Sequence, residues 1–218
     1  MIINTEFDKE QEYLSKEELE EIKNIKINGI PKESIKMVND VFTRSRKDWI
    51  QTFSGERFYP LTPDINTINI IDIAHALSMQ CRFSGHTKFH YSVAQHCVYV
   101  SYLCNIEDAF YGLLHDASEA YLVDVPKPLK DSGKFLEYKI LEKNLQNMIY
   151  QKYIGGEEPG SVHKADMICL ATEATQLYNN LRDDWVLPTN PSPFIIEEMS
   201  PGKAKQLFID RFNELNGK

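Results

Sequence analysis

Histidine and carboxylate side chains interrupt three apolar helical patterns of this chain, and these residues could do chemistry. His115, Asp116 and Glu119 share one such pattern, and His96 and Asp166 lie in two others. Ionisable groups are costly in apolar surroundings unless they are paired, hydrogen-bonded or bound to a metal. These residues are therefore candidates for a metal site and the groups around it.

Two imidazoles and two carboxylates form a ligand set of intermediate hardness. Such a set suits one divalent first-row ion, Mn²⁺, Co²⁺, Fe²⁺ or Zn²⁺, better than Mg²⁺. Helical bundles build metal sites from side chains that project inward from facing helices. Four protein ligands would leave two positions of an octahedral ion open for a water molecule and a phosphate oxygen. The predicted ligands are His96, His115, Asp116 and Asp166.

Glu119 follows Asp116 by three residues and His115 by four, so one continuous helix would carry all three in the same sector. Gly112 leaves that sector bare, where another group could approach closely. Glu119 would need a raised pKa to donate a proton near neutral pH. Burial and Asp116 raise that pKa and a bound metal lowers it, and the sequence does not rank these opposing effects.

Apolar residues at helical spacing predict an all-α fold with the metal site near its centre. One small β-hairpin near residues 51–60 is the only strand-like stretch. His75 lies in an apolar stripe and is interpreted as a core histidine. The expected helices cover residues 68–80, 92–104, 105–122, 135–153, 162–173 and 201–215.

Length and composition indicate an ordinary globular protein. The chain has 218 residues and a formal net charge of −8, which disfavours a binder of nucleic-acid polymers. It contains no run of about 18–20 apolar residues and no signal-peptide pattern at its start. Four cysteines without a CxxC pair suggest free thiols in a reducing compartment. We therefore expect a cytoplasmic protein without a membrane partner.

The leading segment differs in composition from the rest. Residues 1–28 hold eight acids and four lysines, which is half of the net charge. We predict a helical N-terminal extension over residues 1–48 and a catalytic domain over residues 49–218.

The order of the candidate ligands, together with two motifs, is similar to that of HD-domain metal-dependent phosphohydrolases. The string HDASE covers His115–Glu119, and DVPKPLK covers Asp124–Lys130. Arg82 stands fourteen residues before His96, and KADMICL surrounds the last ligand. The chain most resembles the bacterial 5′-deoxynucleotidases and their phage-encoded relatives. The resemblance extends from about Arg82 to Leu177, less than half of the chain.

The resemblance implies one divalent metal on the four ligands named above, and it implies roles for their neighbours. Glu119 would be the general acid/base, and Arg82 would hold phosphate and take part in catalysis. Asp124 would accept a hydrogen bond from the 3′-hydroxyl of the sugar, and Lys130 would assist at the phosphate.

The same resemblance implies a small-molecule nucleotide substrate, most simply a deoxynucleoside monophosphate, and a homo-oligomer. Phe83 replaces a tryptophan of the bacterial enzymes, so the contact to the base is expected to differ. His86 and Lys88 could contact further phosphates, which keeps a triphosphohydrolase as an alternative. A nucleotide sensor with little activity is the other alternative. A phage-encoded relative would act in the host cytoplasm.

Overall fold

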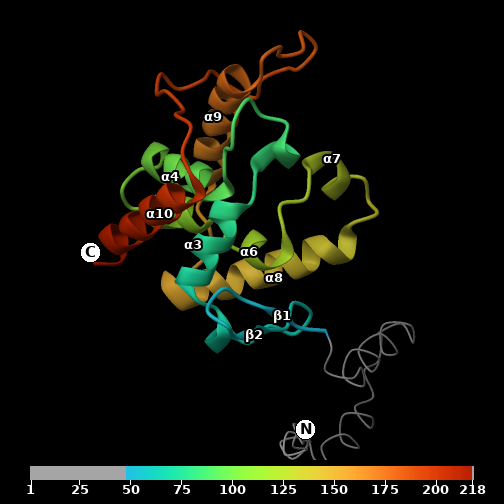
Figure 1. Ribbon diagram of the computed structural model, residues 1–218, viewed down its shortest axis with the longest axis vertical. Coiled ribbons are helices and arrows are strands. Elements are labelled where there is room, and N and C mark those ends of the chain that lie inside the picture. Colours follow the sequence, from blue (N-terminus) through green and yellow to red (C-terminus); the bar gives the residue numbers. More distant parts are fainter. Residues whose placement is uncertain (1–47, 218) are drawn as a thin grey trace, which may run out of the picture. The chain divides into compact units, whose positions relative to one another are not determined.

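The computed structural model describes residues 48–217, which are mostly helical (Figure 1). The predicted extension over residues 1–48 lies outside the described residues except for its last position. The elements are β1 (Ile50–Gln51), β2 (Arg57–Phe58), η2 (Ile65–Thr67), α3 (Ile70–Met79), η3 (Arg82–Gly85), α4 (Val93–Leu103), α5 (Ala109–Leu114), α6 (Glu119–Leu122), α7 (Lys127–Lys130), α8 (Leu136–Tyr153), α9 (Gly160–Leu177) and α10 (Pro201–Asn216). The expectation of a helical fold is confirmed for this part of the chain.

The strands β1 and β2 form the small hairpin that the sequence predicted. They pair antiparallel, with Ile50 opposite Phe58. The Phe58 ring is fully buried and stacks on Tyr121 of α6, with 4.0 Å between the ring centroids. Asp72 of α3 accepts hydrogen bonds from the backbone and the hydroxyl of Ser54 in the hairpin loop. The hairpin is therefore anchored to the helical core.

Helix α4 lies at the centre of the core and contacts α3, α5, α9 and α10. Side chains on all its sides are buried, as expected for a helix enclosed by other helices. Ser92 caps its start, because its hydroxyl accepts a hydrogen bond from the Gln95 backbone at 3.1 Å. This cap fixes where α4 begins and hence where His96 points.

Within residues 48–217, no helix has the length and apolar character needed to cross a bilayer. The four cysteines are free thiols, as predicted. A cytoplasmic location and a homo-oligomer stay predictions.

His75 is partly exposed and stacks on Phe53 of the hairpin loop, with 3.8 Å between ring centroids.

The prediction of a continuous helix through His115 and Glu119 was wrong. Helix α5 ends at Leu114, α6 begins at Glu119, and residues 115–118 form turns. The Glu119 backbone donates to Asp116 at 3.0 Å, a tighter i→i−3 pattern than that of an α-helix.

A glutamine side chain from α8 interrupts the helix at this point. The Gln146 amide nitrogen donates to the Leu114 carbonyl at 2.6 Å, and its oxygen accepts from the Ser118 backbone at 3.0 Å. Leu114 and Ser118 are the two residues that would bond to each other in an uninterrupted α-helix. The inserted carboxamide satisfies both groups and holds the segment open.

Candidate metal centre

Four side chains from three parts of the fold converge on one point. His96 comes from the middle of α4, His115 and Asp116 from the turn after α5, and Asp166 from α9. The structure therefore brings together all four residues that the sequence proposed as ligands.

The distances between their donor atoms suit a single divalent ion. His96 Nε2 lies 3.2 Å from His115 Nε2, 3.3 Å from Asp166 Oδ1 and 3.5 Å from Asp116 Oδ2. His115 Nε2 lies 3.3 Å from Asp116 Oδ2 and 4.0 Å from Asp166 Oδ1. Ligands that bind an ion at about 2.0–2.2 Å lie about 3.0–3.5 Å apart in octahedral or tetrahedral geometry. His96, His115 and Asp116 thus could hold a metal ion, and Asp166 lies 3.3 Å from His96 at the same point.

The second nitrogen of each histidine ring has its own acceptor. His96 Nδ1 lies 2.6 Å from Oε1 of Glu173, and His115 Nδ1 lies 2.9 Å from the Gly112 carbonyl. Both Nδ1 atoms therefore act as donors, which leaves the Nε2 atoms facing the cluster. Outer partners of this kind orient histidine ligands in metal sites.

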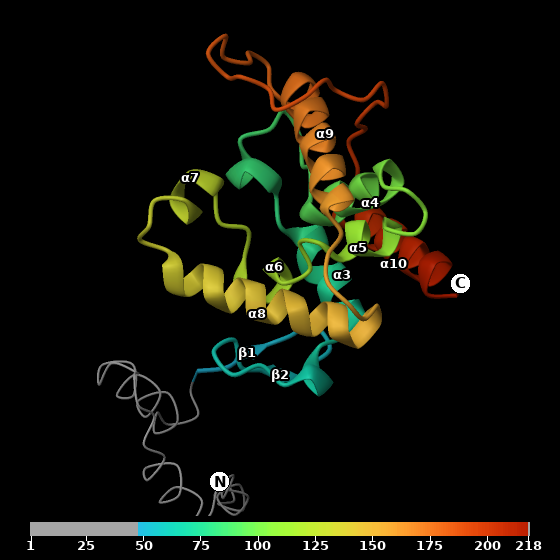
Figure 2. The same cartoon turned by 180° about the vertical axis from the view of Figure 1, so that it is seen from behind.

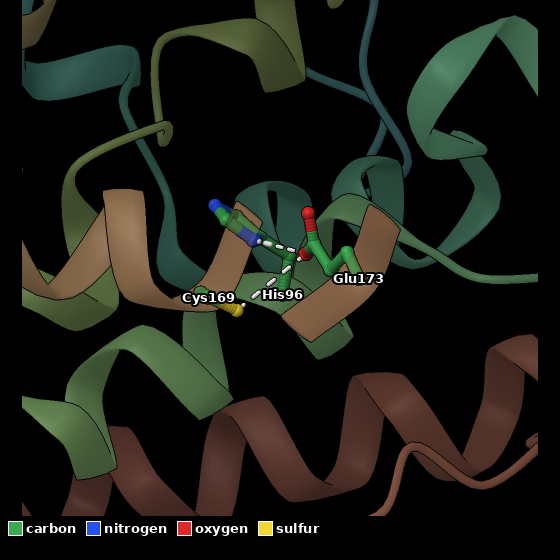
Figure 3. Close-up of side chains that lie close together, drawn as sticks. All are labelled: His96, Cys169 and Glu173. Carbon is green, nitrogen blue, oxygen red and sulfur yellow. Dashed lines mark hydrogen bonds and ion pairs between the residues drawn. The ribbon is translucent and has the colours of Figure 1, made fainter. Parts of the chain in front are cut away.

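Glu173 is fully buried and accepts from several groups at once (Figure 3). The Tyr91 hydroxyl donates to it at 2.8 Å, and Arg82 Nη2 lies 3.1 Å from its second oxygen. Burial raises the pKa of Glu173, but the charges of Arg82 and His96 outweigh burial and lower this pKa to about 2. Glu173 is therefore ionised at neutral pH.

Sequence reasoning did not assign Glu173 a role. The one available signal was its position seven residues after Asp166 in the same helix, which places both carboxylates on one face. That spacing does not reveal its partner, because His96 lies 77 residues earlier in the chain.

His96, Cys169 and Glu173 form a second cluster close enough to hold an ion. Their contacts favour a supporting role instead. The 2.6 Å between His96 and Glu173 is a hydrogen-bond length, shorter than the usual separation of two ligands on one ion. Burial and Glu173 raise the pKa of Cys169 well above its usual range, so the thiol stays protonated and donates to Glu173 at 3.5 Å. In Figure 3 the other His96 nitrogen points away from this cluster.

The Arg82 guanidinium lies at the edge of the ligand cluster. Its Nη1 is 3.5 Å from Asp116 Oδ2, and its side chain is 13% exposed. Its Nε is buried and has no hydrogen-bond partner among residues 48–217. Phe83 and Ser84, which follow it in η3, both have a φ of 53°, in the left-handed region that side chains avoid.

Glu119 follows Asp116 by three residues and is almost completely buried. Its Oε1 accepts from Lys130 at 3.1 Å, whereas its Oε2 has no partner within the described range. Burial raises the pKa of Glu119 well above its usual value, and Asp116 and Asp124 raise it further. The opposing effects of Lys130 and Arg82 are smaller, so burial dominates among the protein's own groups.

Asp124 is held beside Glu119 by a shared partner. Gln80 donates through its amide nitrogen to the Glu119 carbonyl at 2.9 Å and accepts from the Asp124 backbone at 3.1 Å. The Asp124 side chain is partly exposed, and burial raises its pKa.

A cavity of about 380 Å³ connects two of the ligands with α7 and α8. Its lining residues are His115, Asp116, Ser118, Glu119, Lys130, Lys139, Glu142, Lys143 and Gln146.

Other residues singled out from the sequence have their contacts elsewhere. Lys88 donates to the Gln176 carbonyl at the end of α9, and His86 is exposed behind η3. Phe83 packs edge-on against Tyr178 and Trp185, with 5.6 and 6.4 Å between ring centroids. His86 and Lys88 therefore make no described contact with the four ligands.

Fold and site together define a mostly helical protein with a candidate divalent-metal centre. No family model matches the chain. It is 42% identical over 174 residues to the uncharacterized protein YfdR of Escherichia coli K12, covering 77% of this chain and 96% of YfdR. An uncharacterized protein of Rhodobacter capsulatus is 36% identical over 192 residues, covering 78% of this chain and 96% of that protein. The chain belongs to the same family as YfdR.

Proposed function

We propose that this protein is a metal-dependent phosphohydrolase of the HD type that acts on a nucleotide. The simplest reaction is hydrolysis of a deoxynucleoside monophosphate to the deoxynucleoside and phosphate. The observation that carries the proposal is that donor atoms of His115, Asp116 and Asp166 all lie 3.2 to 3.5 Å from His96 Nε2, with Arg82 beside Asp116.

The donor set fits one divalent ion held by His96, His115, Asp116 and Asp166. Mn²⁺, Co²⁺, Fe²⁺ or Zn²⁺ fits these nitrogen and oxygen donors better than Mg²⁺. When bound, such an ion polarises a phosphoryl oxygen and lowers the pKa of water.

Arg82 would bind and orient the phosphate. Its Nε–H has no partner within residues 48–217, and its Nη atoms are held in place by Asp116 and Glu173. A guanidinium held in this way can donate to phosphate oxygens and stabilise negative charge that develops during the reaction.

Glu119 would supply a proton to the leaving oxygen. Water attacks phosphorus, the bond from phosphorus to the sugar oxygen breaks, and that oxygen takes the proton from the Glu119 carboxyl. One proton of the attacking water stays on the released phosphate, and the other returns to the Glu119 carboxylate. The raised pKa keeps this carboxyl protonated at higher pH than an ordinary glutamate. Its unpartnered Oε2 is the atom free to make this transfer.

Asp124 would bind the sugar. The assignment rests on the family resemblance, and two features of the structure support it. The Asp124 carboxylate is partly exposed, and its backbone is tied through Gln80 to the same segment as Glu119. An aspartate so placed can accept a hydrogen bond from a deoxyribose hydroxyl.

The test is an activity screen with a matched variant. With Mn²⁺ or Co²⁺, the full chain should release phosphate from at least one deoxynucleotide. Glu119→Gln keeps the size of the side chain but cannot serve as the acid, so turnover should fall by about 10²–10⁴-fold. Metal binding, measured as a shift of the thermal midpoint, should persist in this variant.

The released product separates the enzymatic alternatives. Orthophosphate from a monophosphate supports the simplest reaction, and tripolyphosphate from a triphosphate supports a triphosphohydrolase. If no deoxynucleoside mono- or triphosphate gives product with any of the four ions, the enzymatic proposal falls. A nucleotide-sensing role would then be the remaining alternative.

A further inference from the structure

The cavity beside the metal ligands has a wall of lysines on the side formed by α7 and α8. Lys130 ends α7, while Lys139 and Lys143 lie one turn apart on α8. Figure 2 shows α7 and its loops arching over the first turns of α8. The cavity thus extends from His115 and Asp116 to three cationic side chains.

Two of these three lysines have charge available for a ligand. Lys130 is committed to the protein, because it lies 3.1 Å from Glu119 and 2.5 Å from Glu142. Among residues 48–217, the ammonium group of Lys139 has one partner, Asp131 at 3.0 Å, and the two side chains are 46% and 53% exposed. An exposed pair of this kind is worth about 0–1 kcal/mol, so another anion can replace Asp131 at little cost.

Lys143 is exposed and has no ion-pair or hydrogen-bond partner in the part of the chain that the structure describes. The acidic residues of the cavity do not neutralise it. Glu119 and Glu142 both accept from Lys130, and Asp116 faces the ligand cluster. Lys139 and Lys143 therefore have no carboxylate partner among the residues that line the cavity.

The composition of this wall indicates what it would bind. None of the nine lining residues is Phe, Tyr or Trp, and the one ring among them, His115, belongs to the candidate ligand set. Flexible ammonium groups that can each form up to three hydrogen bonds are well suited to phosphate oxygens. Tyr138 lies behind Lys130, whose Nζ is 5.7 Å from its ring centroid, and Phe83 lies beside Arg82, whose guanidinium carbon is 5.2 Å from the Phe83 ring centroid.

We propose that Lys139 and Lys143 form a second phosphate subsite, which binds phosphate groups of a linear polyphosphate chain beyond the one held at the metal centre. The assumption that this polyphosphate is part of a nucleotide rests on the proposed function. The subsite would favour nucleoside di- or triphosphates over monophosphates. In this proposal Lys139 and Lys143, rather than His86 and Lys88, contact the further phosphates.

Binding of inorganic tripolyphosphate tests the subsite without any need for turnover. Calorimetric titration of the full chain, as purified, would compare wild type with the double variant Lys139→Ala/Lys143→Ala. Loss of two charge-assisted contacts should weaken tripolyphosphate binding about ten-fold, whereas orthophosphate binding should change less than about two-fold. The control is Lys134→Ala/Lys203→Ala, which also removes two exposed lysines but none that line the cavity.

The proposal is overturned if the wall variant binds tripolyphosphate as tightly as wild type, or if the control loses as much affinity. The same variants should then be assayed on dAMP and dATP. A selective loss with dATP would show that the nucleotide uses the subsite, and equal losses with both would contradict that use. Absence of hydrolysis by wild type would refute the proposed function, while the tripolyphosphate titration would still judge the subsite.

Discussion

His96 and Glu173 are joined by a hydrogen bond of 2.6 Å between Nδ1 and Oε1, and both side chains are fully buried. The bond links α4 to α9 and sets the ring orientation of a candidate metal ligand. Glu173 therefore does two things at once: it supports the packing of two helices and it aims a ligand.

Glu173→Gln should weaken both functions. The substitution removes the negative charge that balances Arg82. The NH₂ group of the amide cannot accept a hydrogen bond, so it would face a donor that now bonds to a carboxylate oxygen. We expect metal affinity to fall about 10–100-fold. The free energy of unfolding should fall by about 1–3 kcal/mol. Metal titration and urea denaturation measure these effects, with the exposed Glu157→Gln as control. Unchanged metal affinity would show that Glu173 does not orient His96.

Asp166→Asn should abolish stabilisation by metal. A ligand at 100 times its dissociation constant stabilises the folded state by about 2.7 kcal/mol, so Mn²⁺ or Co²⁺ should raise the thermal midpoint of wild type by several degrees. The variant lacks one charged ligand and should show little shift. His163→Ala changes an exposed residue of the same helix and should respond like wild type. A full shift in Asp166→Asn would remove Asp166 from the ligand set.

Gln146→Ala tests the inserted carboxamide. Without it, the Leu114 carbonyl and the Ser118 backbone N–H can bond to each other and extend α5. The change from the present i→i−3 pattern to a regular α-helix would alter the angle between consecutive side chains from about 120° to about 100° and so shift the donor atoms of His115 and Asp116 relative to each other. We expect metal affinity to fall at least ten-fold, which corresponds to a loss of about 1.4 kcal/mol of binding free energy.

The neighbouring Asn147 is exposed, so Asn147→Ala is the matched control for this loss. Equal metal affinities of Gln146→Ala and wild type would mean that the turn at residues 115–118 forms without the glutamine.

Buried tyrosines predict a loss of stability at alkaline pH. Burial raises the pKa of Tyr121 and Tyr150 and raises that of Tyr153 to about 12. These hydroxyls ionise near pH 10 in the unfolded chain but keep their protons in the folded one. Their contribution to stability is therefore complete below pH 10 and is lost as pH rises from 10 towards 12 and above.

Ultraviolet titration of tyrosine ionisation, alongside denaturant unfolding between pH 8 and pH 11, would measure this effect. Stability should be level up to about pH 9 and should then decline. Tyrosines that all titrate near pH 10 while the protein remains folded would contradict the assigned burial.

Features that depend on local spacing were predictable from the sequence. The hairpin near residues 51–60 and the cap at Ser92 follow from turn and capping residues that lie close together in the chain. The ligands His96, His115, Asp116 and Asp166 could be proposed because ionisable residues stand out in apolar helical patterns. The structure places these four together.

Features that depend on long-range packing were not predictable. Gln146 looks like an ordinary polar residue of α8, and only the approach of α8 to residues 114–118 makes it interrupt a helix. Lys139 and Lys143 likewise look like a solvated helix face until the cavity is seen in front of them. Periodicity shows which face of a helix is polar, but it does not show what that face meets.

The left-handed backbone of Phe83 and Ser84 affects which substitutions this protein could accept after Arg82. A side chain in that region costs about 1–2 kcal/mol of backbone strain per residue. Glycine at position 84 would relieve the strain at that residue, but it would also let η3 sample conformations that carry the guanidinium away from Asp116. Selection for a more stable fold and selection for a fixed arginine therefore make opposite demands on Ser84.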